Sequence, residues 1–490
     1  MSAGLDSDVV VIGGGPAGTV AALALARLGR SVVLCEAAEF PRAHIGISLS
    51  PGVRKQLAFL GLEHLLDRAD HRTGIPVERR WNGPAFERAE GEPAVVADRG
   101  VLDADLLDAA RGHGVHVLQP ASVTSLRRTE ENRWHLDVAT PAGPMSIGAA
   151  FVIEATGRRT RFRRRQRNGA PTVAVVGQWR GPAAEAMRIS ALGAAWCWGA
   201  PTGPESSVLA VFADPREFRR GSGSIRDRYL KLAHASAVLP CLEELHLDEA
   251  PVICDATPYA TEDETARLLR VGDADIALDP LSSSGVQAAI QSALAAGPVV
   301  NTLLTPAEDD GSALEFWNRS RANRMMQHRR WAAQLYREAF NAHSTAFWGN
   351  RCETLPALPA AAETTPLPDP DQSICVSDQT RLVLAPCLTG SLVKRLECVQ
   401  HASLAEPVAF VGGVYFPPLL RHATYPMPAR EIMAAWSTMV TPRQAWSLLG
   451  WAWRNAILTQ AAAERSRGPA RVTPAHSTQA SAVPKSAPAN

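Results

Sequence analysis

The sequence predicts an α/β fold in which a nucleotide-binding domain is interleaved with a β-sheet domain and followed by a small C-terminal α+β module. Three observations lead to this fold class. A strand, a glycine-rich turn, a helix, a second strand and an acid follow one another in residues 9–36. A later strand ends at Gly272-Asp273 and leads into a helix from Val286. Strand-like runs dominate the intervening residues 172–265, so the first domain is expected to be discontinuous.

Changes in composition set the expected domain boundaries. A chain of 490 residues suits two or three domains. The expected segments are 1–171 and 266–352 for the nucleotide-binding domain, 172–265 for the β-sheet domain, with 75–97 as a candidate addition to it, 353–372 for a Pro/Ala/Thr linker, 373–464 for the C-terminal module, and 465–490 for a disordered tail.

The turn at residues 13–18 carries the glycines of the dinucleotide-binding fingerprint. It follows an apolar strand and opens a helix, which is the local context of a Rossmann-like βαβ unit. Gly13 is expected to permit the tight turn, and Gly15 to let the backbone approach a pyrophosphate. Gly18 is expected to let helix and strand pack closely.

The start of this helix and the acid after the second strand complete the expected nucleotide site. Pro16 and Ala17 open the helix, whose N-terminal N–H groups suit phosphate oxygens. Glu36 stands 18 residues after Gly18, where its carboxylate can accept hydrogen bonds from ribose hydroxyls. We therefore expect a bound dinucleotide.

The overall composition narrows the partners and the compartment. Fifty basic and 49 acidic side chains leave no charge bias, so no nucleic-acid partner is expected. The eight cysteines form no CxxC pair, which suits reduced thiols and a cytoplasmic location. No apolar run reaches the roughly 18 residues of a membrane span, and residues 1–8 contain no targeting segment.

A loop follows Glu36 and reads Phe40-Pro41-Arg42-Ala43-His44-Ile45-Gly46-Ile47-Ser48-Leu49-Ser50-Pro51. Its pattern resembles the FAD-dependent halogenases and the related monooxygenases and reductases of the para-hydroxybenzoate hydroxylase fold. The resemblance implies that Arg42 lies near the cofactor and that the loop around Gly46 and Ser48 passes along the isoalloxazine ring. Family members commonly have Glu where this chain has Ile47.

A second motif begins with Asp98-Arg99-Gly100-Val101-Leu102-Asp103, and Asp103 is the expected cap of a helix. It resembles the family segment R-x-x-L-D-x-x-L, which implies that Arg99 contacts FAD. The strand 149–157 resembles the family strand that closes over the dinucleotide. The next ten residues, 158–167, include seven arginines. We expect a solvated surface there, with a phosphate-facing loop or a partner surface as alternatives.

A third motif runs from Gly272 to Gly285 and resembles the family pattern GD-A-x-x-x-x-DP-x-x-S-x-G. The resemblance implies that Asp273 binds the ribityl chain, and that Pro280 and Gly285 lie where a helix N-terminus faces the flavin pyrimidine. A helix N-terminus stabilises an anion by roughly 0.3–1 kcal/mol, which suits the negative charge of reduced flavin. The three motifs together imply non-covalent FAD, reduced by external NAD(P)H or by reduced flavin from a separate reductase.

The β-sheet domain contains Trp196-Cys197-Trp198-Gly199-Ala200-Pro201. This segment resembles the W-x-W-x-x-P of flavin-dependent halogenases, with Ala200 where isoleucine is usual. We expect the two tryptophans to face opposite sides of their strand, so that at most one lines a pocket; the alternative is that both are core. With Ser48 and Pro280, the two tryptophans are the candidates for the catalytic pocket.

The remaining segments predict elements without a functional motif. Arginines and aromatic residues are dense in 312–348, which is expected to form a helix pair. In the C-terminal module we expect helices at 392–401, 428–439 and 442–458, and a hairpin at 407–416 that turns at Gly412-Gly413. No ligand pattern for a metal is present, so no metal is expected.

The resemblance also implies the chemistry. In this family reduced flavin and oxygen give a C4a-hydroperoxide, which hydroxylates a ring or, with halide, gives a hypohalous acid that passes to a lysine. This chain has Glu78, Arg79, Arg80 and Trp81 where the family lysine is expected. Arginine stays protonated and is a poor nucleophile, so a tryptophan-type halogenase is not expected.

We therefore expect an FAD-dependent monooxygenase that hydroxylates an electron-rich aromatic ring, specifically a tryptophan side chain in a protein or peptide. The layout is similar to the flavoproteins that build tryptophylquinone cofactors. The alternatives are a halogenase or hydroxylase of a small or carrier-bound aromatic, a geranylgeranyl-reductase-like enzyme, and a non-catalytic FAD-binding partner protein. Residues 158–167, 312–348 and 373–464 are the candidate docking surfaces for a macromolecular substrate.

Overall fold

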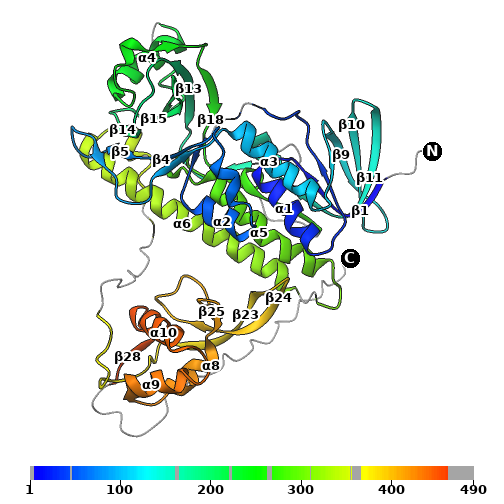
Figure 1. Ribbon diagram of the computed structural model, residues 1–490, viewed down its shortest axis with the longest axis vertical. Coiled ribbons are helices and arrows are strands. Elements are labelled where there is room, and N and C mark those ends of the chain that lie inside the picture. Colours follow the sequence, from blue (N-terminus) through cyan, green and yellow to red (C-terminus); the bar gives the residue numbers. More distant parts are fainter. Residues whose placement is uncertain are drawn as a thin grey trace, which may run out of the picture. The chain divides into compact units, whose positions relative to one another are not determined.

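The computed structural model describes residues 5–42, 44, 47–159, 165–219, 223–261, 267–308, 311–353, 355 and 366–461. The chain divides into two compact units: one spans Met1–Leu355 and Gly390–Leu392, the other Pro356–Thr389 and Val393–Asn490 (Figure 1). The predictions for Gly46, for arginines 161, 163 and 164, for most of the 353–372 linker and for the 465–490 tail lie outside the described residues.

The first unit contains a mainly parallel sheet that starts at the N-terminal strand. Its spatial order is β8 (His116–Leu118), β2 (Val32–Cys35), β1 (Leu5–Ile12), β11 (Gly143–Glu154), β10 (Trp134–Thr140) and β9 (Ser122–Arg128), with β20 (Leu268–Arg270) beside β11. β1 runs parallel to both β2 and β11, and β20 runs parallel to β11. The late strand β20 therefore returns to the N-terminal sheet.

Three helices pack together beside this sheet: α1 (Pro16–Arg27), α3 (Arg99–Gly112) and α5 (Gly285–Leu303) (Figure 1). α1 directly follows the glycine turn, and its first eight residues are all buried. The loop after β2 leads to β3 (Ser48–Leu49), α2 (Gly52–Phe59) and the 3-10 turn η1 (Glu63–Asp67). β3 joins a small sheet with β7 (Ala94–Val96) and β4 (Arg72–Ile75).

A second, mostly antiparallel sheet has the order β17 (His246–Leu247), β13 (Val173–Arg180), β16 (Ser206–Ala213), β15 (Ala195–Gly203), β14 (Met187–Ala191), β5 (Val77–Arg80) and β6 (Glu87–Arg88), with β18 (Val252–Asp255) beside β13. α4 (Ile225–Ser236) packs against β15 and β16. α4 packs into one hydrophobic cluster of this sheet, and the long helix α6 (Ser312–His343) packs into another. The sheet is therefore buried on both faces.

Short elements connect the two sheets. β12 (Arg165–Arg167), β19 (Tyr259–Thr261) and β21 (Ile276–Ala277) form a three-stranded sheet. The 3-10 turns η4 (Gly272–Ala274) and η5 (Pro280–Ser282) lie between β20 and α5. The α/β class and the combination of a mainly parallel sheet with a second, mostly antiparallel sheet match the prediction.

The second unit has its own core. β22 (Ser373–Val376) pairs with β27 (Met427–Pro428) and β28 (Leu458–Gln460), and β25 (Phe410–Val411) pairs with β26 (Val414–Tyr415). The helices are α8 (Pro417–Leu420), α9 (Ala429–Trp436) and α10 (Pro442–Arg454). Trp436 is fully buried in this core and donates its indole N–H to the Leu419 carbonyl at 2.8 Å.

Three element predictions were wrong. Residues 392–401 were expected to form a helix but form strand β24 (Leu392–Gln400), which pairs with β23 (Arg381–Thr389) across Gly390. The expected helix pair at 312–348 is the single helix α6 followed by the four-residue α7 (Ala346–Gly349). Asp103 does not cap α3. Asp98 does, because its carboxylate accepts the N–H groups of Gly100 and Val101.

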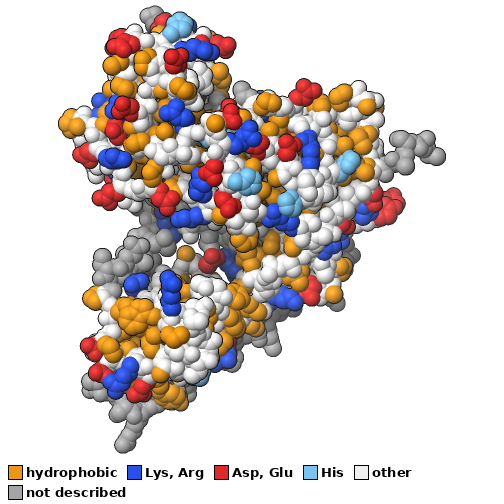
Figure 2. Space-filling view, viewed as in Figure 1, with side chains coloured by type: hydrophobic (Ala, Val, Ile, Leu, Met, Phe, Trp, Pro, Cys, Tyr) orange, Lys and Arg blue, Asp and Glu red, His pale blue; other side chains and the backbone are white. Residues whose placement is uncertain are grey.

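Acidic and basic side chains are intermixed over the face shown in Figure 2. This distribution agrees with the near-zero net charge of the chain. Among the described helices, none combines the length and the apolar character needed to cross a membrane.

Candidate functional site

The glycine turn leaves open space at one glycine and none at the other two. Gly13 has a φ of +109°, and a Cβ placed on it would lie 2.4 Å from the Ala155 carbonyl oxygen. A Cβ on Gly18 would lie 1.9 Å from the Gly13 carbonyl oxygen. A Cβ on Gly15 would meet only the Arg42 guanidinium, at 3.7 Å. The backbone at Gly15 is therefore the accessible part of the turn, as a pyrophosphate would require.

Glu36 is buried beside this turn. Its carboxylate accepts the N–H of Gly14 at 2.6 Å and the N–H of Ala38 at 2.8 Å. These bonds hold the glycine turn against the end of β2. The contact of Glu36 with a ribose stays a prediction.

Two arginines share one buried carboxylate next to Gly15. The Arg99 guanidinium donates to both oxygens of Asp103, at 2.9 and 3.1 Å, and Arg42 lies 3.7 Å from the same carboxylate. Two guanidinium groups face this one carboxylate, and the buried Glu36 carboxylate also contacts the turn, so these four side-chain charges balance. Guanidinium N–H groups beside Gly15 suit the oxygens of a pyrophosphate.

Asp273 is far from the glycine turn in the sequence but lies close to it in the structure. A Cβ on Gly272 would lie 2.8 Å from the Ala17 Cβ, so the Gly-Asp turn packs on the first turn of α1. The Asp273 carboxylate lies 3.3 Å from the Arg158 guanidinium. Burial raises the pKa of the Asp273 carboxyl, and the charges of Arg158 and Arg99 oppose that rise. The structure thus brings the glycine turn, Arg42, Arg99 and Asp273 together.

A partly open cavity of about 390 Å³, which we call the α5 cavity, adjoins Asp273. Ser284, which directly precedes Gly285 at the start of α5, lines the same cavity. Ser50 and Gln287 also line it, and the Ser50 hydroxyl donates to the Gln287 side-chain oxygen at 2.6 Å. Asp273 and the N-terminus of α5, which both belong to the third motif, therefore line the same cavity.

The four predicted pocket residues border one hydrophobic cluster. The Ser48 hydroxyl lies 3.5 Å from the Met187 sulfur. Met187 belongs to the cluster that contains Trp196, Trp198 and Leu281, the neighbour of Pro280. Neither tryptophan is among the described residues that line the α5 cavity.

The prediction that the two tryptophans face opposite sides of their strand was wrong. Trp196 and Trp198 pack in the same cluster, while Cys197 between them packs in the cluster beneath α4. The physical reason is that side chains alternate along a strand, so residues two apart share a face. Trp196 stacks on Phe212, with ring centroids 3.8 Å apart, and both tryptophans are core residues.

A buried network around Asp279 has no counterpart in the sequence predictions. The Asp279 carboxylate accepts the Tyr336 hydroxyl at 2.9 and 2.8 Å and the Leu281 N–H at 3.0 Å. The Asp279 N–H donates to Nε2 of His328 at 3.0 Å. Helix α6 therefore holds the turn that carries Pro280.

Burial sets the protonation of this network. It lowers the pKa of His328, an effect that the charge of Asp279 opposes. A neutral His328 is also what the Asp279 N–H bond requires, since Nε2 must accept. Burial and the neighbouring Asp279 carboxylate together raise the pKa of Tyr336 well above its usual value. In the sequence, only the Asp-Pro pair indicated a turn here. The bonds to Tyr336 and His328 could not be predicted, because both residues lie on a helix that is distant in the sequence.

A second partly open cavity, of about 360 Å³, lies along α6, and we call it the α6 cavity. It shares Leu278 and His328 with the α5 cavity. Asp279, Tyr336 and Arg351 also line it. Among the described residues, no group of three or more His, Cys, Asp or Glu side chains could hold a metal ion.

The fold and the glycine turn define an FAD-dependent oxidoreductase. The family model described as "FAD dependent oxidoreductase" matches residues 8–158. The tryptophan 2-halogenase of Chondromyces crocatus is 28% identical over 373 residues, which are 70% of this chain and 70% of that protein. The chain is an FAD-dependent oxidoreductase with FAD as its cofactor, and it is similar in sequence to a halogenase.

Two solved structures share the fold. The peptidyl tryptophan dihydroxylase QhpG, essential for tryptophylquinone cofactor biogenesis, superposes with a TM-score of 0.71 at 24% identity, covering 92% of this chain and 99% of that one. The flavin-dependent halogenase CmlS superposes with a TM-score of 0.75 at 19% identity, covering 94% and 96%. These coverages confirm the predicted fold class.

Proposed function

We propose that this FAD-dependent oxidoreductase is a monooxygenase that hydroxylates an electron-rich aromatic ring, and that the ring is a tryptophan side chain of a protein or peptide. The observation that carries the proposal is the placement of the lysines. Among the described lining residues of the α5 and α6 cavities, none is a lysine. A halogenase that passes a hypohalous acid to a lysine needs one there.

The residues at the expected lysine position serve structural roles. Glu78 on β5 pairs with Arg188 on β14, with 2.7 Å between the charged atoms. The Arg80 guanidinium donates to the Ser190 hydroxyl and to the Ser236 carbonyl. Both side chains tie β5 into the second sheet and are committed to it.

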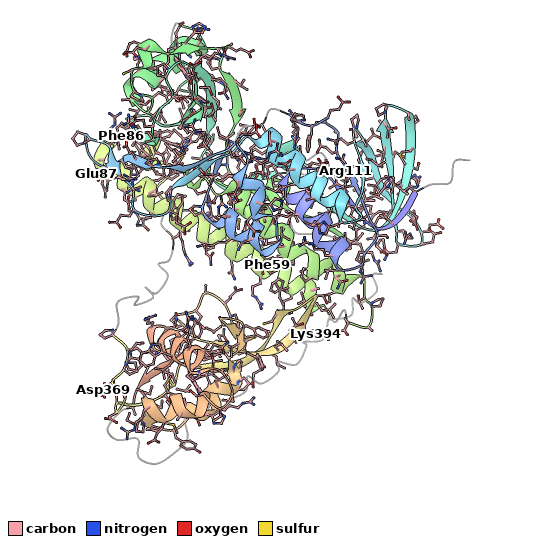
Figure 3. The ribbon with its side chains drawn as sticks, viewed as in Figure 1. Phe59, Phe86, Glu87, Arg111, Asp369 and Lys394 are labelled. Atoms are coloured by element: carbon pink, nitrogen blue, oxygen red, sulfur yellow. The ribbon has the colours of Figure 1, made fainter. Side chains whose placement is uncertain are left out.

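The lysines themselves lie elsewhere. Lys55 exposes 77% of its side chain and lies 3.5 Å from Glu92. Lys231 is on α4, and Lys394 is on β24 of the second unit (Figure 3). The similarity to a peptidyl tryptophan dihydroxylase over nearly the whole chain supports the peptide substrate. The halogenase CmlS has a comparable TM-score, so the fold alone does not separate the two reactions.

The proposal gives each group of residues a task. The Gly15 turn, Glu36, Arg42, Arg99 and Asp273 would hold FAD. When bound and reduced by an external donor, FAD would activate O2, so that one oxygen atom enters the substrate ring and the other leaves as water. The turn before α5, fixed by α6, would orient the flavin edge, and the apolar cluster around Trp196 would exclude water. An indole ring is electron-rich enough to react without a dedicated base.

The test is mass spectrometry of synthetic peptides that contain one tryptophan, after incubation with the FAD-loaded protein, a reductant and oxygen. The expected result is a gain of oxygen on that tryptophan. A matched peptide with phenylalanine at the same position is the control and should stay unchanged. Oxidation of free small aromatics only would contradict the peptide substrate, and substrate-dependent flavin reoxidation without oxygen would indicate a reductase.

A halogenase of a small or carrier-bound aromatic is the second candidate. The named function of the Chondromyces crocatus relative favours it. The same incubations with added bromide decide between the two. A brominated product would replace the monooxygenase proposal, whereas hydroxylation that is indifferent to bromide would support it.

A further inference from the structure

Strand β18 lies at an edge of the second sheet (Figure 1). It pairs with β13 on one side, in antiparallel register, and no other described strand pairs with it. Val252 is 57% exposed and Ile253 is 49% exposed. Because neighbouring side chains point to opposite faces of a strand, both faces of β18 are open to solvent at these two residues.

The hydrogen bonds to β13 leave part of the β18 backbone unused. Just beyond the strand, the Ala256 N–H donates to the Thr172 carbonyl at 2.9 Å. In an antiparallel pair, residues that exchange hydrogen bonds alternate with residues whose backbone groups point away from the partner. The register therefore directs the N–H and C=O of Ile253 and Asp255 away from β13. Those of Ile253 have no hydrogen-bond partner in the part of the chain that the structure describes.

One arginine connects the end of β18 to the candidate flavin site. The Arg158 guanidinium donates to the Asp255 carbonyl at 3.0 Å, and its Nε lies 3.3 Å from the Asp273 carboxylate. The same guanidinium donates at 3.3 Å to the carbonyl of Leu278, which lines both the α5 and the α6 cavity. A chain that lies along β18 and continues past Asp255 therefore arrives next to the guanidinium that contacts Asp273.

We propose that the open edge of β18 binds an extended segment of the polypeptide substrate by β-strand addition, antiparallel to β18. The Ile253 N–H and C=O exchange two hydrogen bonds with one residue of that segment. The reactive tryptophan lies on the N-terminal side of the bound segment, because an antiparallel chain has that end near Asp255. The choice of the substrate as the occupant rests on the proposed function.

The chemistry of this edge fits an extended polypeptide. The unused groups are one backbone donor and one backbone acceptor on the same residue, and an extended residue of another chain presents the matching pair. Asp255 is the only charged residue of β18, and the strand contains no proline. Charges and prolines are the features that keep other chains from pairing with a sheet edge. Val252 and Ile253 offer apolar contacts to side chains of an added strand on both faces.

The test uses the blocked peptide Trp-Gly-Thr-Val-Thr-Val, in which one tryptophan precedes an alternating β-branched run. Calorimetry measures its binding to the FAD-loaded protein without reductant. N-methylated versions of the peptide each lack one backbone donor. Binding should weaken about fivefold or more when the methylated amide faces β18, and should change little at the neighbouring amides. Equal effects at every amide, or no binding of the peptide, would overturn the proposal.

Two variants of Ile253 separate the backbone from the side chain. Ile253→Pro removes the outward N–H but no hydrogen bond to β13, and an edge strand tolerates proline at such a position. It should weaken peptide binding about fivefold or more. Ile253→Thr is the matched control, because it keeps the N–H and the β-branched shape, and it should bind nearly as well as the wild-type protein.

Melting temperature and FAD affinity show whether each variant is folded. Equal peptide binding by folded Ile253→Pro and Ile253→Thr would contradict the proposed edge site. If Ile253→Pro does not fold, the methylated peptides decide.

A second copy of this chain is the alternative occupant of the edge. Analytical ultracentrifugation without peptide tests this alternative. A wild-type dimer that Ile253→Pro dissociates would assign the edge to self-association and overturn the proposal.

Turnover is scored separately from this binding. Peptide binding with the expected alternation but without hydroxylation would leave the edge site standing and reject the proposed function. Hydroxylation of the peptide with the same KM by the wild-type protein and by Ile253→Pro would do the reverse.

Discussion

Tyr336 of α6 donates its hydroxyl hydrogen to the carboxylate of Asp279, 57 residues earlier in the chain, with O···O distances of 2.9 and 2.8 Å. Asp279 in turn caps η5 through the Leu281 N–H. The geometry of the turn before α5 therefore depends on a helix outside the cofactor motifs. Substitutions in α6 that break this bond should therefore alter the turn before α5.

Tyr336→Phe should destabilise the protein while leaving its fold intact. The ring is 3% exposed and packs near Trp348, so phenylalanine keeps the packing and removes only the hydroxyl. Loss of a bond to a buried carboxylate should cost about 1–3 kcal/mol of unfolding free energy. Thermal unfolding measures it. Tyr425→Phe, at an exposed tyrosine, is the control and should have little effect.

His328 should make stability depend on pH. Burial lowers its pKa in the folded protein below the usual 6.5. Above pH 6.5 the histidine is neutral in both states and contributes no pH dependence. As the pH falls below 6.5, the unfolded chain takes up a proton that the folded protein resists, so stability decreases until the folded pKa is reached.

Chemical denaturation across this pH range should therefore show a smaller loss of stability for His328→Gln than for the wild-type protein. Glutamine keeps an acceptor for the Asp279 N–H and does not titrate. His71 and His401 also have pKa values lowered by burial, and they contribute equally to both proteins. Identical pH profiles for the two proteins would contradict the role given to His328.

Substitutions in the glycine turn should separate folding from FAD binding. Gly13→Ala puts a Cβ 2.4 Å from a backbone oxygen at a φ of +109°, so the turn must distort and stability should fall. Gly15→Ala meets only the mobile end of Arg42 and should fold normally. We expect Gly15→Ala to lose FAD affinity at unchanged melting temperature of the apoprotein. Unchanged FAD affinity would mean that no pyrophosphate approaches Gly15.

Local patterns predicted the nucleotide-binding half of the fold well. The glycine turn has a continuous local motif: Gly13 adopts a positive φ and Gly18 packs on the Gly13 carbonyl, although Ala155 after β11 also crowds Gly13. The helix prediction for residues 392–400 was wrong because a tertiary contact, not the local pattern, determines their structure. Its apolar residues Leu392, Val393, Leu396 and Val399 have helix-like spacing. The turn at Gly390 and the partner strand β23 decide the outcome, and pairing overrides such spacing.

The candidate site was predicted only where motifs are continuous. Arg99 and Asp103 are four residues apart, a spacing that brings side chains together on a helix, so their pairing was within reach of the sequence. Arg158 with Asp273 and Tyr336 with Asp279 are tertiary contacts between distant segments. No periodicity or composition signals such contacts in one sequence.

Asp273→Ala should weaken FAD retention. The carboxylate lies at the α5 cavity, exposes a third of its side chain and is flanked by Arg158 at 3.3 Å. An ionised carboxylate there can accept hydrogen bonds from ligand hydroxyls, and a charged bond contributes roughly 1.5–3 kcal/mol. The dissociation constant for FAD should therefore rise about tenfold or more.

Flavin fluorescence on titration of the apoprotein with FAD measures this change. Asp248→Ala is the matched control, because Asp248 forms a comparable 2.7 Å pair with the exposed Arg180 on the second sheet. The control should retain the wild-type affinity. Equal affinity of Asp273→Ala and Asp248→Ala would show that Asp273 does not contact the cofactor. A folded protein that takes up no FAD in any form would reject the assignment of the whole site.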